Sequence, residues 1–457
     1  MRQWLFRVLE GRDMTRWASV PGPAPTFPLG NGGDFIGSRW PWEVCADYAK
    51  QYGGLTLVWF FGRPALVLND PALIGEVLDT RWQDFYKRGP VEALRPVITP
   101  QSLFITNLGH GWETARRENP LTQAGPDAWL DKQVAPLREE ITAFVRSRVE
   151  AAKPVDLYWD TQQLMFDAFS RAFWGETFSP DRFDWFQTLA REGTRRMGRP
   201  FQYLPAINPF FLSARKKWYA AFTERVRHAR ANPKPGTADL LHATIAQCGA
   251  MPDEALAESL ATNYFGGVFS CASTVNTTLY LLAKHPGELD IVRQAVRQDL
   301  GGGYDRTALD ACRPLEFAVR EAMRFYPAVP IYFRNSAIDR EVKLGSHTLP
   351  PDTLLMISNW HLHTHSPHWG DPEAFRPARW DHGGLDANPF GSGHFFPFGR
   401  GPRACIGSEF ARLVNKIALA TILNESDPTL DGDPAYWQHF FFGVMMPKGL
   451  TARFAAR

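Results

Sequence analysis

Residues 396–407 read FPFGRGPRACIG, a stretch that holds one cysteine among three glycines and two arginines. A helical pattern over residues 409–423 follows at once. Glycines allow tight backbone turns close to a flat ligand, and backbone N–H groups at a helix start favour an anionic sulfur. Arg403 adds a cation two residues from Cys405. The loop therefore predicts a thiolate that ligates a metal, the alternative being a buried free cysteine in a glycine-rich turn.

The loop resembles the cysteine-ligand loop of the cytochrome P-450 superfamily, which reads Phe-x-x-Gly-x-Arg-x-Cys-x-Gly. Five residues occupy the family positions in register: Phe398, Gly401, Arg403, Cys405 and Gly407. The resemblance implies the mainly α fold of that superfamily with a minor β part. It implies that Cys405 ligates the iron of haem b (iron protoporphyrin IX). It also implies a cofactor-binding role for four other loop residues: Phe398, Gly399, Arg403 and Gly407.

Two further segments follow the order that the superfamily shows. Glu321 and Arg324 lie in a helix-like run over residues 315–326, and side chains three residues apart share one helix face. Residues 375–380 read FRPARW and resemble the superfamily's Pro-Glu-Arg-Phe segment, with alanine and tryptophan as departures. The resemblance implies a structural network of Glu321, Arg324 and Arg379 beneath the haem. Such a buried charged cluster holds only if every member is paired.

The resemblance implies that arginines at three places bind carboxylates, and the planar guanidinium suits this role because it donates two parallel hydrogen bonds. Trp112 and Arg116 are one helical turn apart, so both can face one ligand. The resemblance implies that this pair binds one haem propionate and that Arg334, in the extended run 330–334, binds the other. With Arg403, three cations would meet two carboxylates. The alternative for the first pair is a solvated basic helix face.

The sequence predicts a long central helix, which opens at residues 252–254 with a proline and two acids and ends before Pro286. In the superfamily this helix crosses the distal face of the haem. Where the family reads Ala/Gly-Gly-x-Asp/Glu-Thr, this chain reads Gly266-Gly267-Val268-Phe269-Ser270. The two glycines predict a bulge with room above the iron for a diatomic ligand. The family's acid and alcohol, however, are replaced.

The replaced pair leaves the mechanism open. Phe269 can carry no proton, whereas Ser270 can donate one hydrogen bond. Either water, Ser270 and a substrate group complete proton delivery in an ordinary O2-dependent monooxygenase, or the enzyme is peroxide-driven, rearranging or coupling. A third reading is that Phe269 merely seals the pocket; a non-catalytic haem sensor is the remaining alternative. If the missing acid is limiting, Phe269→Asp with Ser270→Thr should improve the coupling of electron use to product.

Composition sets looser bounds. We find no long linker, repeat or abrupt shift in charge among the 457 residues, so we predict a lead over residues 1–20 and one domain over residues 21–457. The net charge of +2 does not suggest nucleic-acid binding. Five scattered cysteines, an odd number, indicate a reducing compartment rather than a disulfide framework.

The N-terminal stretch contains no run long enough to span a bilayer or to act as a secretory signal. Residues 1–18 space apolar side chains among arginines, as a peripheral amphipathic helix does; the alternative is a short helix packed on its own domain, or frayed. The proline-rich run 21–31 resembles the entry segment of the superfamily's microsomal-type branch, without its anchor. We therefore expect a soluble, cytoplasmic protein of bacterial type.

The sequence also bears on the electron donor and the substrate. It has no flavin or nicotinamide motif, so electrons would come from a separate donor. A basic patch is predicted around the loop from Arg400, Arg403, Arg412 and Lys416. Such a patch suits an acidic ferredoxin or flavodoxin with its reductase. By family position, mostly apolar stretches line the pocket and favour a hydrophobic small molecule: residues 85–106, 265–270, 329–333 and 440–444.

Four histidines at positions 361, 363, 365 and 368 gather in a loop that also holds proline and tryptophan. A zinc site is one interpretation. We interpret them as surface histidines instead, because the loop matches a polar run of the superfamily. The remaining patterns predict a hairpin over residues 55–68, short strands over 343–349 and 354–357, and helices over much of 128–195, 213–233, 237–247 and 286–298.

Overall fold

The computed structural model describes residues 14–35, 40–99, 102–109, 111–123, 126–197, 208–234, 236–247, 251–381, 393–433, 440–441 and 443–456. They divide into two compact units. The sheet unit comprises residues 1–92, 324–374 and 384–405, and the helical unit comprises 93–323, 375–383 and 406–457. The single domain over residues 21–457 stays a prediction.

A five-stranded sheet with the strand order β1-β2-β8-β5-β3 organises the sheet unit. Its strands are β1 (Leu55–Phe60), β2 (Arg63–Leu68), β3 (Phe85–Tyr86), β5 (Tyr332–Ser336) and β8 (Leu354–Ile357). The predicted hairpin is confirmed, with Leu55 opposite Leu68 in the antiparallel β1–β2 pair. Phe61 and Gly62, at φ 49° and 79°, form its two-residue turn, which matches the twist of the strands. The other contacts of β2 are parallel, to β8.

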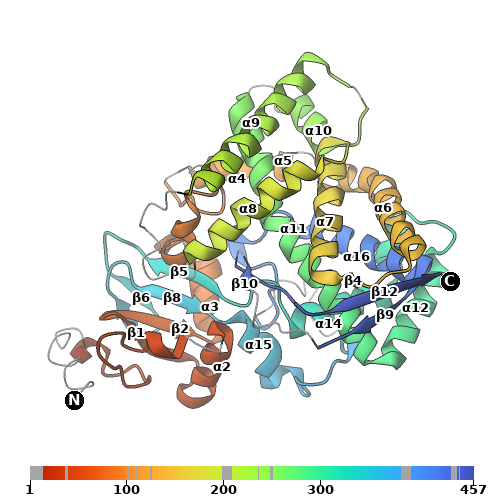
Figure 1. Cartoon of the computed structure of the whole chain (residues 1–457). Coiled ribbons are helices and arrows are strands. Elements are labelled where there is room, and N and C mark those ends of the chain that lie inside the picture. Colours follow the sequence, from red (N-terminus) through yellow and green to blue (C-terminus); the bar gives the residue numbers. More distant parts are fainter. Residues whose placement is uncertain are drawn as a thin grey trace. The chain divides into compact units, whose positions relative to one another are not determined.

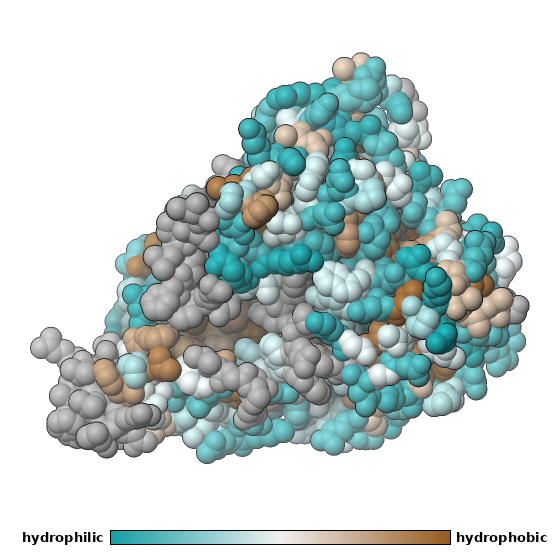
Figure 2. All heavy atoms as spheres, in the orientation of Figure 1, coloured by the Kyte–Doolittle hydropathy of each residue, from teal (hydrophilic) through white to brown (hydrophobic). Residues whose placement is uncertain are grey.

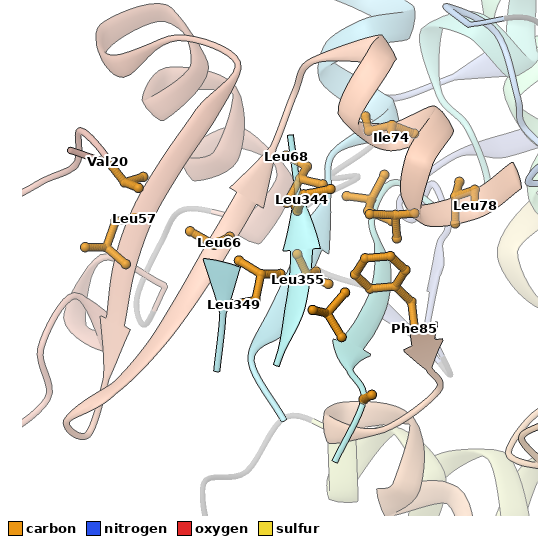
Figure 3. Close-up of a cluster of buried hydrophobic side chains, with 14 of the residues drawn as sticks. Val20, Leu57, Leu66, Leu68, Ile74, Leu78, Phe85, Leu344, Leu349 and Leu355 are labelled. Atoms are coloured by element: carbon orange, nitrogen blue, oxygen red, sulfur yellow. The ribbon is translucent and has the colours of Figure 1, made fainter. Parts of the chain in front are cut away.

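The core of the sheet unit lies between this sheet, the ribbon of β6 (Val342–Leu344) and β7 (His347–Leu349), and the helix α3 (Pro71–Gly75). Figure 3 shows Leu66 and Leu355 of the sheet close to Leu344 of the ribbon, with Ile74 of α3 beside them. The helices α2 (Pro41–Tyr52) and α15 (Asn359–His365) complete the unit. Burial of this aliphatic surface is the main force that assembles segments so distant in sequence.

The N-terminal lead is partly described, since residues 1–13 lie outside the described residues. Thr15–Trp17 forms a short 3-10 helix, and Trp17 is buried in the core of the sheet unit. A short helix packed on its own domain, one of the two sequence interpretations, therefore holds for this end of the lead. The expected membrane contact of residues 1–18 stays a prediction.

The helical unit is built around α11 (Asp253–Lys284), which packs against α7, α9 and α16 (Figure 1). The remaining helices are α4 (Trp112–Arg117), α5 (Pro120–Gln123), α6 (Pro126–Ala151), α7 (Leu157–Trp174), α8 (Pro180–Met197), α9 (Pro209–Ala231), α10 (Leu240–Gln247), α12 (Pro286–Leu300), α13 (Arg306–Ala311) and α16 (Ser408–Glu425). The helix α14 (Arg313–Phe325) runs from the helical unit into the sheet unit. Small sheets add β4 (Val155–Asp156), β12 (Thr451–Ala456) and β9 (Ser426–Asp431) in that order, and β10 (Phe440–Phe441) with β11 (Val444–Met445).

Most predicted elements are confirmed. The chain is mainly α with a minor β part, and the central helix has the predicted bounds. The predicted helical region 128–195 is three helices, because Pro154 cannot continue α6 and Gly175 ends α7 in a left-handed conformation, at φ 73°. Hydrophilic residues cover most of the helices on the face in Figure 2. Within the part of the chain that the structure describes, no helix has the length and apolarity to cross a membrane.

Candidate functional site

Residues 396–405 of the cysteine loop lie in the sheet unit and turn tightly. Gly399 and Gly401 have φ of 73° and 66°, a region that favours glycine. A Cβ at Gly401 would lie 2.1 Å from the carbonyl oxygen of Leu78, so no other residue fits there. The Cys405 N–H donates to the carbonyl oxygen of Phe398 over 2.8 Å. Cys405 is exposed, whereas the other cysteines that the structure describes are buried. The loop therefore keeps its cysteine accessible to a ligand.

Side chains of the same unit hold this loop. The Arg403 guanidinium lies 5.7 Å from the centroid of the Trp82 ring, a cation–π distance. Tyr332 donates its hydroxyl to the carbonyl oxygens of Phe396 and Pro397, over 3.0 and 2.9 Å. The sequence had indicated Tyr332 only as a pocket-lining residue. The signal that could have revealed its role is a phenol two residues before Arg334 on one strand, hence on the same face.

Arg334, on β5, tests whether a haem fits the sheet unit. The side chain is 8% exposed, and burial lowers its pKa to about 10. Its Nη1 donates to the Phe333 carbonyl oxygen over 2.8 Å, and among the described residues no carboxylate forms an ion pair with it. A buried guanidinium without an anion is costly. A propionate would supply the missing carboxylate, so these residues fit the haem that the loop implies.

The helical unit carries the second predicted propionate pair on α4. Trp112 is buried, and the Cζ of Arg116 lies 5.9 Å from the centroid of its ring. Both side chains therefore lie on one face of the helix, as the spacing predicts. Gly111 precedes the helix with φ of 89° and lets the chain turn into it. Their contact with a haem stays a prediction.

The helix α11 is continuous through Gly266 and Gly267, so the predicted bulge is wrong. A Cβ at Gly267 would lie 2.2 Å from Phe169 Cε1, and one at Gly266 would lie 2.8 Å from Phe104 Cζ. The space beside each glycine is filled by a phenylalanine ring of the same unit. The two glycines therefore permit close aromatic packing, where the sequence predicted room for a diatomic ligand.

Phe269 and Ser270, which stand on α11 in place of the family's acid and alcohol, both contact partners within the helical unit. The Phe269 ring is fully buried and stacks on Phe186 of α8, with centroids 4.8 Å apart and an interplanar angle of 8°. The Ser270 hydroxyl donates to the carbonyl oxygens of Gly266 and Gly267, over 2.9 and 3.1 Å. Phe269 is thus a core residue, and the Ser270 proton is held by the backbone of its own helix.

The predicted structural network is present in part. Glu321 is fully buried and accepts from Arg379 Nε over 2.8 Å and from Trp380 Nε1 over 3.0 Å. Arg324 donates through Nη1 to the carbonyl oxygens of His363 and Pro372, over 2.9 and 2.8 Å. Its role in the sheet unit is therefore to tie backbone segments together, and its pairing with Glu321 stays a prediction.

The predicted basic patch is wrong for the two cations of α16. Lys416 is 2% exposed and pairs with Asp310 and Glu316. Arg412 pairs with Glu316 over 3.2 Å and with Glu409 over 3.1 Å. Sequence proximity to the loop placed these cations together. Asp310 and Glu316, from other helices, and Glu409, from α16 itself, neutralise them.

The interpretation as surface histidines is wrong for His363 and confirmed for His368, which is exposed. His363 is fully buried, and its Nε2 accepts from the Phe396 N–H over 3.0 Å. Among the described residues, no group of three or more histidine, cysteine, aspartate or glutamate side chains is placed to hold a metal ion. The zinc interpretation therefore has no support.

Three of the residues predicted to line the pocket lie outside the described residues: Pro100, Gln101 and Phe442.

Comparisons with known proteins identify the family. The cytochrome P450 family matches residues 20–449. The Probable cytochrome P450 6d5 of Drosophila melanogaster is 25% identical over 86% of this chain and 85% of its own length. A Flavonoid 3',5'-hydroxylase of Crocosmia x crocosmiiflora is 25% identical over 94% and 86%, and the Pluviatolide synthase of Sinopodophyllum hexandrum is 25% identical over 88% and 85%.

Proposed function

The chain belongs to the cytochrome P450 family, whose members are haem-thiolate monooxygenases, and we propose that Cys405 ligates the iron of haem b in it. The observation that carries this assignment is the exposed Cys405 at the end of a tight loop, in the same unit as a buried arginine without an anion. When bound, the haem supplies the redox chemistry. The protein would hold it through the thiolate and through arginines that donate hydrogen bonds to its carboxylates.

Each arginine has a defined task in this proposal. Arg334 would donate to one propionate, whose negative charge would offset the cost of burying the guanidinium. Arg403, beside Trp82, would donate to propionate oxygens within the sheet unit. The propionate contact of Trp112 and Arg116 on α4 is a separate part of the proposal. Phe398, Gly399 and Gly407 would shape the loop around the sulfur.

The substrate is proposed to be a hydrophobic small molecule, and the electron donor a ferredoxin or a flavodoxin with its reductase. Members of the family need a separate redox partner. Arg412 and Lys416 of α16 are neutralised by carboxylates, so they would not attract an acidic donor. A separate donor is proposed because the sequence holds no flavin or nicotinamide motif. Stopped-flow reduction by each donor class tests it. A cytoplasmic location remains part of the proposal.

A second candidate, peroxide-driven oxidation or a rearrangement or coupling reaction, is favoured by the α11 geometry. Neither Phe269, which is in the core, nor Ser270, which is bonded to its own helix, offers a proton to a ligand. A peroxide brings its own protons and needs no such relay. Product formation with hydrogen peroxide alone, compared with product formation with a reductase and O2, separates the two candidates.

Replacement of Cys405 tests the central assignment. We expect Cys405→Ala to lose the long-wavelength absorption band of the reduced carbon-monoxide complex, because only a thiolate ligand produces it. Cys271→Ala, at a buried cysteine of α11, is the matched control and should keep the band. A Cys405→Ala protein that kept the band would show that another residue is the ligand.

A further inference from the structure

The backbone of Phe396, at the start of the cysteine loop, is held on both sides by side chains. Its N–H donates to His363 Nε2 over 3.0 Å, and its carbonyl oxygen accepts from the Tyr332 hydroxyl over 3.0 Å. Tyr332 also donates to the next carbonyl oxygen, that of Pro397, over 2.9 Å. Backbone groups of a buried residue need such partners, and here polar side chains supply both.

These contacts lie close to the ligand cysteine. The Phe396 carbonyl oxygen also accepts from the Gly399 N–H over 2.9 Å, and the Phe398 carbonyl oxygen accepts from the Cys405 N–H over 2.8 Å. The peptide groups that Tyr332 fixes therefore lie directly before the one that holds the Cys405 amide.

The two side chains come from elements that are themselves anchored. Tyr332 lies on β5, two residues before Arg334 and therefore on the same face of the strand. His363 lies on α15, and its carbonyl oxygen accepts from Arg324 Nη1 over 2.9 Å. The His363 ring also packs against Phe396, with centroids 5.4 Å apart. Strand, helix and loop thus meet at one residue.

We propose that Tyr332 and His363 are positioning residues that clamp the Phe396 peptide and so hold Cys405 in the geometry of a thiolate ligand. Tyr332 further ties the loop to the strand that carries Arg334, so the sulfur and one propionate partner keep a constant separation. This inference rests on the proposed role of Cys405. It assigns both side chains a function that acts through the loop, without contact with substrate.

The test uses the full-length haem-loaded protein and follows the reduced carbon-monoxide complex over time. Tyr332→Phe keeps the ring and removes only the hydroxyl. We expect conversion from the thiolate-ligated to the thiol-ligated spectrum to become about tenfold faster, the factor for loss of one buried hydrogen bond. His363→Leu should act in the same direction. His363→Gln, which retains an acceptor near the position of Nε2, should restore a rate close to wild type.

The matched control is Tyr48→Phe, which removes a hydroxyl that donates to Asp34 in the same unit, away from the cysteine loop. It should leave the conversion rate unchanged. A Tyr332→Phe protein that behaves like Tyr48→Phe, in a wild type with a normal thiolate spectrum, overturns the clamp alone. A wild type that never forms the thiolate spectrum overturns the proposed function, and the clamp with it. A His363→Gln protein as fast as His363→Leu also contradicts the assignment of the acceptor.

Discussion

The role inferred for Phe269 from the sequence differs most from the role that the structure shows. Its position matches that of the family's acid, so the sequence led to the expectation that an aspartate there would improve coupling. In the structure the ring stacks face to face on Phe186, within the aromatic core of the helical unit. A carboxylate at this position would lose water without gaining a partner among these rings.

We therefore expect Phe269→Asp to lower the free energy of unfolding by about 3–5 kcal/mol and to abolish, rather than improve, coupled turnover. Phe269→Leu, which keeps an apolar side chain, should cost only about 1–2 kcal/mol. Urea unfolding followed by circular dichroism measures both. A stable Phe269→Asp protein with improved coupling would contradict the packing role.

At the scale of elements, Glu316 of α14 joins three helices through charge. It pairs with Lys416 and Arg412 of α16, and Lys416 also pairs with Asp310 of α13. Burial would raise the pKa of Glu316, but Lys416, Arg412 and Arg320 outweigh it and hold the pKa at about 2. The ordinary value is 4.5, so folding favours the ionised form.

A carboxyl whose pKa is lower in the folded state than in the unfolded state stabilises the fold at pH values above its unfolded pKa. This stabilisation is lost as the pH falls through the folded pKa. Glu316 should therefore contribute about 3 kcal/mol at neutral pH, and this contribution should fade between pH 4.5 and about 2. Glu316→Gln should be destabilised at pH 7 and should show a flatter stability profile below pH 4.5.

Glu409→Gln is the control for this prediction, because its side chain is 50% exposed and pairs with Arg412 on the same helix. Such a surface pair contributes about 0–1 kcal/mol. Thermal melts of both variants across the pH range provide the measurement. Equal melting temperatures for Glu316→Gln and Glu409→Gln at pH 7 would show that the buried pairs do not stabilise the junction of helices.

For the whole molecule, the proposed propionate contact of Arg334 would link haem binding to folding. The apo-protein carries the cost of its buried cation, and a bound carboxylate removes that cost. Arg334→Met should therefore leave the apo-protein as stable as wild type or more stable. In the same variant the stabilisation by haem should shrink by about 2–3 kcal/mol, with haem loss faster by about 30-fold to 150-fold.

Differential scanning calorimetry with and without haem, together with haem transfer to apomyoglobin, measures both effects. Arg340→Met is the control, since Arg340 is exposed and pairs with Asp84 over 2.7 Å. It should change neither haem loss nor the response to haem. If Arg334→Met destabilised the apo-protein and left haem loss unchanged, Arg334 would be a structural residue with no role in cofactor binding.

The sequence by itself determined the family, the loop of Cys405, the hairpin and the central helix. These features are local: glycine positions, ligand spacing and helix-start signals operate within a few residues, so a linear pattern can reveal them. The bounds of α11 agree for this reason. The sequence also shows directly that Phe269 and Ser270 replace the acid and the alcohol of the family.

Only the tertiary structure decided what the side chains at those positions contact. Lys416 lost its place in a basic patch because Asp310 and Glu316 come from other helices, and Phe269 became a core residue because α8 presents Phe186 to it. His363 and Tyr332 lie far from Phe396 in sequence yet hold both sides of its backbone. Such partners are chosen by packing and desolvation across the whole chain, and periodicity and spacing carry no information about them.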